Sequence, residues 1–557
     1  MSMKEELAVV LRKELGEEVF DILEVPPDDN LGDVALPCFS LAKKWRKSPQ
    51  AIADDVAGRV KASFLDKVVV VGAYVNFFVK KEYVAEHILE EILAKKEKFG
   101  SQQIRKEKIV IEYPSPNTNK PLHLGHLRNI FLAQAVANLL RFCGNKIIHV
   151  NLNNDRGVHI CKSMYAYQKF GNNKQPDKKT DHFVGDFYVL YSKQVPEGGE
   201  SEIQEMLQKW ESGDRQVLAL WKKMNDWAMQ GFAETYARLE VKHDKTYNEH
   251  EFYDKGKALV AAGLKKGVFY RNDEGAVEVD LEKYGLGKKV LLRPDGTSIY
   301  ITQDMYLAKK KFDDFKMDRS LYVVGSEQNH HFKVLFKILE LLGMPFAEKC
   351  VHLSYGMVHL PEGRMKSREG TVVDADDILD EVEGLALEEI EKRHKLSKEE
   401  AVSRAKSIGQ GALRFFVLKF DPAKDMVYNP RESLSFEGET GPYVQYTHAR
   451  ICSILRKVNE KLKKVDCAIY GDEEIVLLKM LGRFPEVVKD AAVHYKPSVV
   501  AHYVIKLCQE FNTFYTQCPV LKAEPKLRNA RLVLIDAVRL VVKNSLALVQ
   551  MDAPEEM

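Results

Sequence analysis

Apolar residues in this chain follow two spacings, short runs and longer stretches with a three- and four-residue repeat. Short segments rich in apolar residues at Ile109–Tyr113, 146–153 and 321–325 are typical of strands buried inside a parallel sheet. Between the first two runs, apolar residues recur at helical spacing from Leu122 to a stop at Gly144. The pattern predicts a strand, helix and strand unit of the kind that binds nucleotides.

The remaining pattern predicts an α/β chain with additional parts at both ends. The first 100 residues indicate a helix up to Gly16, two strands near 68–71 and 74–79, and a closing helix. Residues from about 160 to 290 are interpreted as a mostly helical insertion. A helix over Ile299–Phe312 follows, with Ser298 as its expected N-cap. Beyond about residue 385 the chain is predicted to be helical nearly to its end.

Composition narrows the class of protein. The 557 residues are enough for roughly three or four domains, and a net charge of only +2 means that any surface for nucleic acid must be a local patch. The eight cysteines form no C-x-x-C pair, which argues against a zinc ribbon and against a disulfide framework. No stretch is apolar and long enough to suggest a secretion signal or a membrane span. We therefore expect a cytoplasmic protein without a membrane anchor.

The loop between the first predicted strand and helix carries the strongest chemical signal. It contains three prolines and ends in His123-Leu-Gly-His126 at the expected start of the helix. The free N–H groups and positive dipole of a helix N-terminus suit a polyphosphate, and two imidazoles there can donate further hydrogen bonds. Gly125 would let a base or ribose approach the backbone. The sequence thus predicts a nucleotide site, and the alternative is a pair of histidines that merely cap a surface helix.

Two other segments could complete such a site. Pro361–Gly370 carries Arg364, Lys366 and Arg368 between glycines and could close over a phosphate chain, although a basic hairpin without a ligand has the same composition. The strand at 321–325 releases a polar segment at its carboxyl end, where open α/β sheets bind ligands.

These motifs resemble the arginyl branch of the class I aminoacyl-tRNA synthetases. His123-Leu-Gly-His126 is similar to the HIGH signature of that class, and Ser115–Pro121 resembles the lead-in of the arginyl branch. Residues 436–450 and the terminal Asp552–Met557 are similar to the family's helical anticodon domain, and the first 100 residues to its extra N-terminal domain. The resemblance covers nearly the whole chain.

The resemblance implies a Rossmann-type parallel-sheet catalytic core with a helical C-terminal anticodon-binding domain and a small α/β N-terminal domain. The expected domains are 1–103, which would contact the tRNA elbow, 104–437, which contains the insertion and the KMSKS-like loop, and 438–557, which would read the anticodon. The implied reaction is the ATP-dependent activation of L-arginine to arginyl-adenylate and its transfer to the terminal adenosine of tRNA(Arg). The implied partners are ATP, L-arginine and tRNA(Arg). Mg²⁺ would be bound to the substrate ATP rather than to a protein metal site, and the protein would be a monomer.

The resemblance also assigns roles to residues. The expected catalytic residues are Lys120, His123, His126 and Lys366. The expected ATP-binding residues are His123, Gly125, His126, Arg364, Met365, Lys366 and Ser367. The expected arginine-binding residues are Glu112, Ser115, Asn117, Tyr300, Asp304 and Gln328. The expected tRNA-binding residues are Asn76, Tyr443, Tyr446, Tyr515 and Met557.

Residue chemistry agrees with part of this assignment. The guanidinium group of arginine is always charged and requires planar carboxylate partners, and Asp304 and Glu112 are acids near the predicted nucleotide loop. Tyr300 lies four residues before Asp304 on the same helix face. Each acid could instead be an ordinary surface or strand-end residue. The stripe of Phe511, Phe514 and Tyr515 is more typical of core than of a base-stacking surface.

One position departs from the family pattern. The KMSKS signature has a catalytic lysine in its fourth place, where this chain has Ser367. Many arginyl enzymes share this departure and are thought to use a lysine just before the HIGH signature, which here is Lys120. A cation there would stabilise the charge that develops as pyrophosphate leaves.

Two other functions remain open at this point. A small-molecule nucleotidylyltransferase would share the H-x-G-H phosphate site and the basic loop, but it has no evident use for the long helical C-terminal part. A non-catalytic RNA-binding paralogue would be expected to lose Lys120, His123 or His126, and all three are present.

Overall fold

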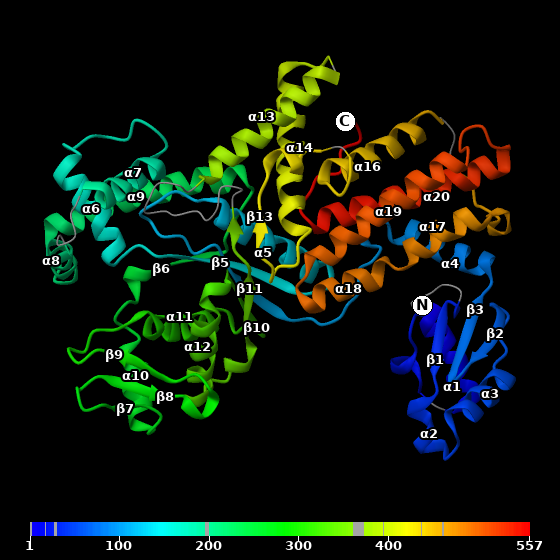
Figure 1. The fold of residues 1–557 in the computed structure, drawn as a ribbon, viewed down its shortest axis with the longest axis horizontal. Helices are drawn as coiled ribbons and strands as arrows, with labels where there is room; N and C mark the ends of the chain where they lie inside the picture. The colour runs from blue at the N-terminus through cyan, green and yellow to red at the C-terminus, as the bar shows by residue number, and fades with distance from the viewer. Residues whose placement is uncertain are drawn as a thin grey trace. The chain divides into compact units, whose positions relative to one another are not determined.

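A parallel sheet of five strands forms the centre of the larger part of the molecule (Figure 1). Its order is β11-β10-β4-β5-β6, and every neighbouring pair runs parallel. The strands are β4 (Lys108–Glu112), β5 (Lys146–Asn153), β6 (Lys245–Asn248), β10 (Arg319–Gly325) and β11 (Cys350–Tyr355). Parallel strands are buried on both faces, which is why the centres of β4 and β10 consist of apolar residues.

The computed structural model describes residues 3–16, 18–26, 31–194, 200–359, 373–393, 395–435, 437–458 and 462–557. The chain forms two compact units, each described here by itself. The first comprises Met1–Phe99, Ile451–Phe484 and Lys506–Val542, and the second comprises Gly100–Arg450, Pro485–Ile505 and Lys543–Met557.

The strand order reverses direction at the centre of the sheet. From β4 the chain proceeds outward through β5 to β6, whereas β10 and β11 lie on the other side of β4. Such a reversal leaves a crevice at the carboxyl ends of the two strands that flank it, β4 and β10. The helices α5 (Leu124–Phe142) and α12 (Asn329–Leu341) follow β4 and β10. The predicted strand, helix and strand unit is therefore confirmed, except that the helix begins at Leu124 rather than Leu122.

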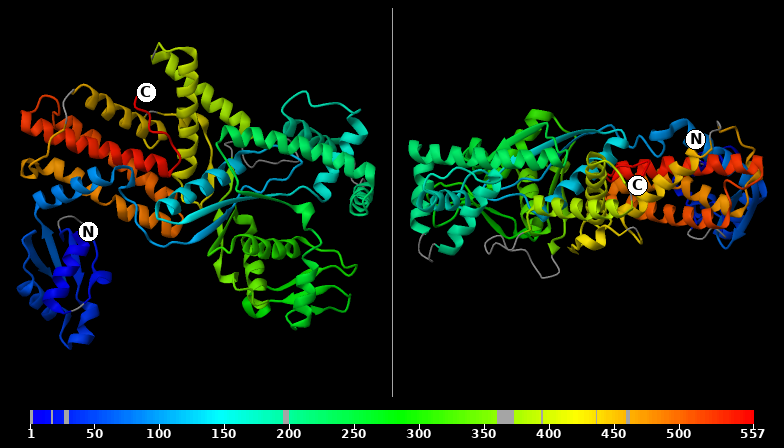
Figure 2. Two further views of the ribbon diagram at one scale, coloured as in Figure 1. Left: turned by 180° about the vertical axis from the view of Figure 1, so that it is seen from behind. Right: turned by 90° about the horizontal axis from the view of Figure 1, so that it is seen from above.

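The region predicted as a helical insertion contains both helices and strands. Its first half is helical, with α6 (Val158–Phe170), α7 (Thr180–Gln194), α8 (Glu200–Glu211) and α9 (Arg215–Arg238), which lie together in all views of Figures 1 and 2. Its second half contributes β6 to the central sheet and then α10 (Lys257–Lys265) with an antiparallel sheet of β7 (Tyr270–Arg271), β8 (Val277–Asp280) and β9 (Lys288–Leu292). The prediction missed β6 because its sequence, Lys-Thr-Tyr-Asn, has no apolar run.

The helix that carries Tyr300 and Asp304 is α11 (Tyr300–Phe315). The prediction that Ser298 caps it is wrong, because Ile299 occupies the N-cap and no side chain caps the helix. Ser298 instead pairs its backbone with Leu292 at the end of β9, so it belongs to the preceding hairpin.

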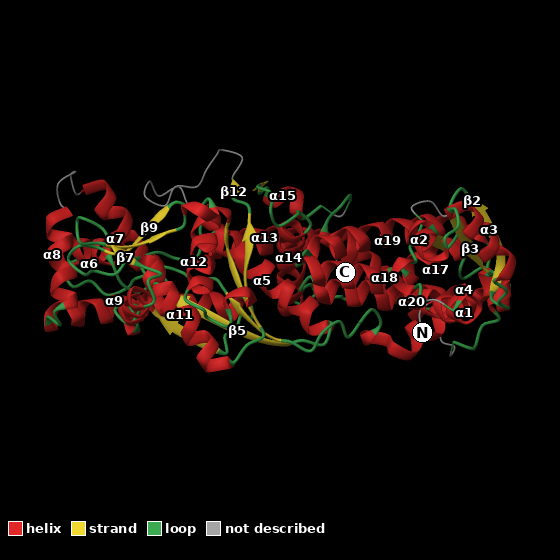
Figure 3. Ribbon diagram, turned by 90° about the horizontal axis from the view of Figure 1, so that it is seen from below, coloured by secondary structure: helices red, strands yellow, loops and turns green. Residues whose placement is uncertain are grey.

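The rest of the second unit is mainly helical, as Figure 3 shows by colour. It includes α13 (Ala375–Arg393), α14 (Lys398–Leu418), α15 (Pro430–Ser433) and the short parallel pair β12 (Val358–His359) and β13 (Met426–Val427). The helices α16 (Gly441–Arg456), α18 (Phe484–His494), α19 (Pro497–Gln517) and α20 (Pro525–Leu548) are each divided between the two units. The prediction of a helical C-terminal part is confirmed.

The first unit contains an antiparallel sheet with the order β1-β3-β2. Its elements are α1 (Met3–Leu15), β1 (Val34–Pro37), α2 (Phe39–Trp45), α3 (Pro49–Arg59), β2 (Leu65–Val71), β3 (Tyr74–Val79), α4 (Lys81–Lys95) and α17 (Asp472–Gly482). The two predicted strands are confirmed as β2 and β3. The described part of the chain also has short 3₁₀ helices at Phe20–Ile22, Lys96–Lys98, Glu249–Glu251, Glu282–Tyr284, Ser326–Gln328, Ala347–Lys349 and Cys467–Ile469.

Candidate active site

Polar segments follow four strands of the central sheet, and all of them begin at the same edge of the sheet. The loop from Tyr113 to His123 follows β4, Asp155 and Arg156 follow β5, Glu249 and His250 follow β6, and Ser326–Gln328 follows β10. Because the strands are parallel, all these segments begin at the carboxyl edge of the sheet. This edge brings together five of the residues that the sequence singled out: Ser115, Asn117, Lys120, His123 and Gln328.

The two histidines of the H-x-G-H motif form the start of α5. His123 is the N-cap residue, and its Nδ1 accepts a hydrogen bond from the N–H of Gly125 at 3.1 Å. Nδ1 of His126 accepts from the N–H of His123, also at 3.1 Å. A neutral imidazole that accepts at Nδ1 carries its proton on Nε2. Both rings therefore present an Nε2–H donor at a helix N-terminus.

Burial keeps these imidazoles neutral. Burial and the nearby Lys120 ammonium lower the pKa of His123 to about 3, and burial with the charges of His123 and Lys120 holds the pKa of His126 well below its usual range. Burial also lowers the pKa of Lys120. Among the residues that the structure describes, none accepts a hydrogen bond from the Lys120 ammonium. A cation without a partner beside two neutral donors is suited to an anionic ligand.

Gly125 lies close to the imidazole of His123. A Cβ at this position would lie 3.0 Å from Cε1 of His123. That contact is closer than van der Waals packing allows, so a side chain here would displace the imidazole.

The basic loop is attached to α5 on its amino-terminal side. Arg128, a buried residue of α5, donates to the carbonyl of Met357 at 3.1 Å. It also donates to the carbonyls of Pro422 and Lys424 at 3.1 and 2.6 Å, and so holds the segments that lead into β12 and β13. The predicted ATP-binding residues Arg364, Met365, Lys366 and Ser367 lie outside the described residues.

The carboxyl-terminal side of the same loop returns to the first turn of α5. The carbonyl of Val373 accepts from the N–H of Leu124 at 3.2 Å, and the N–H of Ala375 donates to the carbonyl of Leu122 at 2.9 Å. Described residues on both sides of the basic loop, Met357 before it and Val373 and Ala375 after it, are thus bonded to residues at or near the start of α5.

Asp304 and Tyr300 project from α11 one turn apart. Tyr300 is 69% exposed, and Oδ2 of Asp304 lies 2.7 Å from Nε2 of His331 on α12. Gln328, which precedes α12, is exposed. An exposed phenol next to a partly exposed carboxylate is available to a charged ligand.

Glu249 is an acid that the sequence interpretation missed. It follows β6, is only 6% exposed, and its side chain is hydrogen-bonded to Gln303 of α11. Burial raises the pKa of Glu249 to about 7, and the negative charges of Asp155 and Asp304 add to the rise. It therefore faces the same acidic region as Asp304. Its position directly after a strand could have marked Glu249 as a site residue, but the sequence did not predict that strand, β6.

Glu112 forms an ion pair with another residue of the protein. Its Oε2 lies 2.6 Å from Nζ of Lys311, and both side chains are buried. The Lys311 ammonium also lies 3.6 Å from the centroid of the Tyr322 ring. Separating a buried ion pair to free one partner costs several kcal/mol, roughly 3–5. The structure thus gives Glu112 a partner within the protein.

Ser115 and Asn117 are held at the end of β4. The N–H of Ser115 donates to Oδ1 of Asn151 at 3.2 Å, and its carbonyl accepts from Nδ2 of Asn154 at 2.9 Å. Ser115 adopts a left-handed backbone conformation with φ +57°, and Asn117 forms a backbone bridge with Asn154. These contacts fix the loop that precedes the histidines.

The residues expected to contact tRNA differ in exposure. Asn76 on β3 is only 4% exposed, whereas Tyr446 on α16 is 45% exposed. Tyr443 on α16, Tyr515 on α19 and the terminal Met557 are half-buried. Phe511 and Phe514 belong to the core, as predicted for most of that aromatic stripe. The roles of the five residues in binding tRNA remain predictions.

Three family models match the chain and together cover nearly all of it. The model "tRNA synthetases class I (R), catalytic domain" matches residues 88–429. The "DALR anticodon binding domain" matches residues 444–557, and the "Arginyl tRNA synthetase N terminal domain" matches residues 1–79.

The chain belongs to the arginyl-tRNA synthetase family. The arginine--tRNA ligase of Treponema pallidum is 46% identical over 560 residues, which covers 96% of this chain and 95% of the relative. That of Treponema denticola is 47% identical over 552 residues and covers 95% and 93%. The solved Thermus thermophilus arginyl-tRNA synthetase has a TM-score of 0.85 at 29% identity and covers 100% of this chain and 99% of its own.

Family membership settles several predictions. The predicted family and fold class are confirmed, and the nucleotidylyltransferase alternative is excluded. None of the described helices combines the length and apolarity that crossing a bilayer requires.

Proposed function

We propose that the arginine–tRNA ligase reaction takes place in one site with two walls, of which one binds ATP and the other binds arginine. The chain is a class I aminoacyl-tRNA synthetase that activates arginine with ATP and transfers it to tRNA(Arg). The observation that carries the proposal is that a helix start with two imidazole donors and a pair of acids lie at the same edge of the sheet. The first wall is the start of α5, and the second consists of Asp304 and Glu249.

The first wall binds ATP. The Nε2–H groups of His123 and His126 donate to phosphate oxygens, and the free N–H groups of α5 add the helix dipole. Neutral donors do not form a fixed ion pair with ATP, so the pyrophosphate product can leave. Mg²⁺ enters with ATP as part of the substrate, since it prefers phosphate oxygens and water to an all-protein site.

Lys120 supplies positive charge near the reacting phosphate. It lacks an acceptor among the described residues and lies close enough to lower the pKa of both histidines. In this chain Ser367 stands where the KMSKS signature has a lysine, so Lys120 replaces that cation. Arg364, Met365, Lys366 and Ser367 bind ATP from the basic loop in this proposal.

The second wall binds arginine. The guanidinium group pairs with Asp304 and with Glu249, which loses its proton on binding, and Tyr300 contributes its hydroxyl. Ser115, Asn117 and Gln328 hold the amino-acid end of the substrate. Glu112 keeps Lys311 neutralised beneath the site rather than contacting arginine directly.

The remaining parts of the proposal concern tRNA(Arg) and the state of the protein. Asn76, Tyr443, Tyr446, Tyr515 and Met557 contribute to tRNA binding. For Asn76 this requires that its buried side chain acts by holding β3 in place. The protein works as a cytoplasmic monomer.

ATP–pyrophosphate exchange with each of the twenty amino acids, with and without bulk tRNA, tests the function. We expect arginine alone to support exchange, because lysine cannot satisfy two carboxylates arranged for a planar fork.

Asp304→Asn should raise the arginine KM by on the order of 10²–10³ and leave the ATP KM unchanged. Comparable exchange with lysine, or a wild-type arginine KM in the variant, would contradict the proposal.

The arginine KM should depend on pH through Glu249. With a pKa of about 7, its carboxyl is ionised above that pH and neutral below it, whereas the guanidinium is charged throughout. We therefore expect the arginine KM to rise about tenfold from pH 8 to pH 6, with a smaller change in the ATP KM. Glu249→Gln should have a raised arginine KM at pH 8 and no such rise toward pH 6. The same pH dependence in both proteins would exclude Glu249 as an arginine ligand.

Removal of the Lys120 charge should slow activation. Lys120→Met is expected to lower kcat by about 10²–10³ with the ATP KM nearly unchanged, because the contact strengthens as the α-phosphate reacts. Ser367→Lys in that background should restore part of the rate. Lys146→Met, at the exposed amino end of β5, is the matched control and should have wild-type kcat. A harmless Lys120→Met, or purely multiplicative effects of the two substitutions, would refute the compensation.

A further inference from the structure

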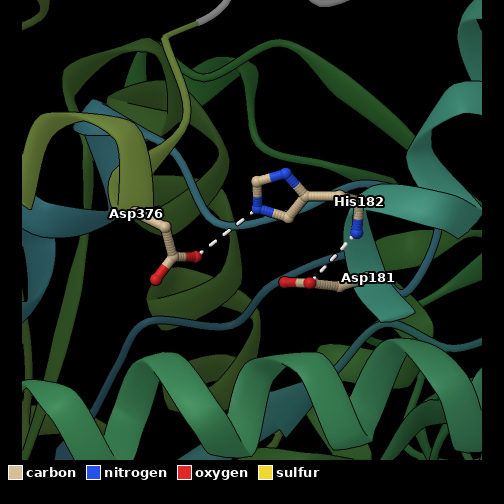
Figure 4. Close-up of side chains that lie close together, drawn as sticks. All are labelled: Asp181, His182 and Asp376. Atoms are coloured by element: carbon tan, nitrogen blue, oxygen red, sulfur yellow. Dashed lines mark hydrogen bonds and ion pairs between the residues drawn. The ribbon is translucent and has the colours of Figure 1, made fainter. Parts of the chain in front are cut away.

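A cluster of charged side chains lies beside the ATP wall and has no role in the proposal above. Asp181 and His182 at the start of α7 and Asp376 at the start of α13 place ligand atoms within 4.8 Å of one another (Figure 4). That spacing would suit a metal ion. However, Nζ of Lys179 lies 2.9 Å from Oδ2 of both Asp181 and Asp376, so an ammonium group already bridges the two carboxylates.

The cluster joins three segments that are far apart in the sequence. Lys179 also donates to Oγ1 of Thr235 on α9 at 2.7 Å, and that hydroxyl donates to Asp376 at 3.0 Å. His182 lies between two acids, with Nδ1 3.3 Å from Oδ2 of Asp374 and Nε2 3.5 Å from Oδ2 of Asp376. The helices α7 and α9 of the insertion thus hold the start of α13.

The segment held in this way contacts the catalytic histidines. Asp374 forms a backbone bridge with His123, and its neighbours Val373 and Ala375 bond to Leu124 and Leu122. The first turn of α5 is therefore fixed by a segment that is itself fixed by Lys179 and His182.

Two glycines show how closely these helices approach. A Cβ at Gly185 of α7 would lie 2.7 Å from Cδ of Pro121, which follows Lys120. A Cβ at Gly231 of α9 would lie 2.3 Å from Oδ1 of Asp181. Neither distance is possible for a side chain, so α7 packs directly against the loop that leads to His123, and α9 packs directly against the cluster.

We propose that Lys179 and His182 are positioning residues for arginine activation, which hold Asp374 and Asp376 so that residues 373–376 fix His123 against ATP. The proposal rests on the ATP role of α5. It assigns part of the helical insertion to the activation step. A purely structural role for the same ion pairs would lower the stability of the fold and leave each correctly folded molecule fully active.

The test compares kinetic constants per active site in pyrophosphate exchange with arginine. The variants are His182→Gln, Asp374→Asn, the two combined, Lys179→Met and Lys179→Arg. Active-site titration corrects for unfolded protein, and thermal unfolding is measured in parallel. Lys178→Met is the matched control, because Lys178 lies next to Lys179 but forms an exposed ion pair with Asp186.

We expect His182→Gln and Lys179→Met to lower kcat by about tenfold to a hundredfold, since small displacements of reacting groups have effects of this size. The arginine KM should stay within about twofold of wild type, because Asp304 and Glu249 lie on other elements. Lys179→Arg should recover most of the activity, and His182→Gln should be non-additive with Asp374→Asn.

Unchanged kcat per active site in His182→Gln and Lys179→Met, with or without a loss of thermal stability, would overturn the proposal. An equal loss in Lys178→Met, or strictly multiplicative effects of the 182 and 374 substitutions, would do the same. A wild-type protein that shows no exchange with arginine would instead refute the function on which the proposal rests.

Discussion

The parallel direction of five strands is the constraint on which the site depends. Because β4, β5, β6 and β10 all point the same way, their carboxyl ends bring segments from residues 113, 155, 249 and 326 to one edge of the sheet. The reversal of strand order next to β4 then leaves room for a ligand where α5 begins. No single local motif could gather the start of α5, with its two histidines, and two acids from such distant parts of the chain.

Charge is distributed unequally along this edge, and in the proposed site this difference separates ATP from arginine. At α5, burial keeps His123 and His126 neutral beside the cation Lys120. At the other wall, burial and the negative charges of Asp155 and Asp304 raise the pKa of Glu249. In the proposed site, ATP and arginine would meet groups of opposite character, while the buried Glu112–Lys311 pair between strand and helix adds no net charge.

Much of this could be predicted from the sequence, because its signals are local. The β4–α5–β5 unit follows from apolar runs, helical spacing and a terminating glycine, and the family follows from motifs such as His123-Leu-Gly-His126. The sequence could not show β6 or Glu249, because a four-residue polar strand is recognisable only by its neighbours in the sheet. It also could not show that Lys311 pairs with Glu112, because that contact joins residues 199 positions apart.

The most direct test of the two-wall account is a crystal structure with arginine and a non-hydrolysable ATP analogue bound together. The account predicts the guanidinium group between the carboxylates of Asp304 and Glu249, at hydrogen-bonding distances of about 2.7–2.9 Å. It also predicts phosphate oxygens at the Nε2 atoms of His123 and His126, with Glu112 still paired to Lys311. A guanidinium bound by Glu112 with Lys311 displaced, or phosphates away from the start of α5, would contradict it.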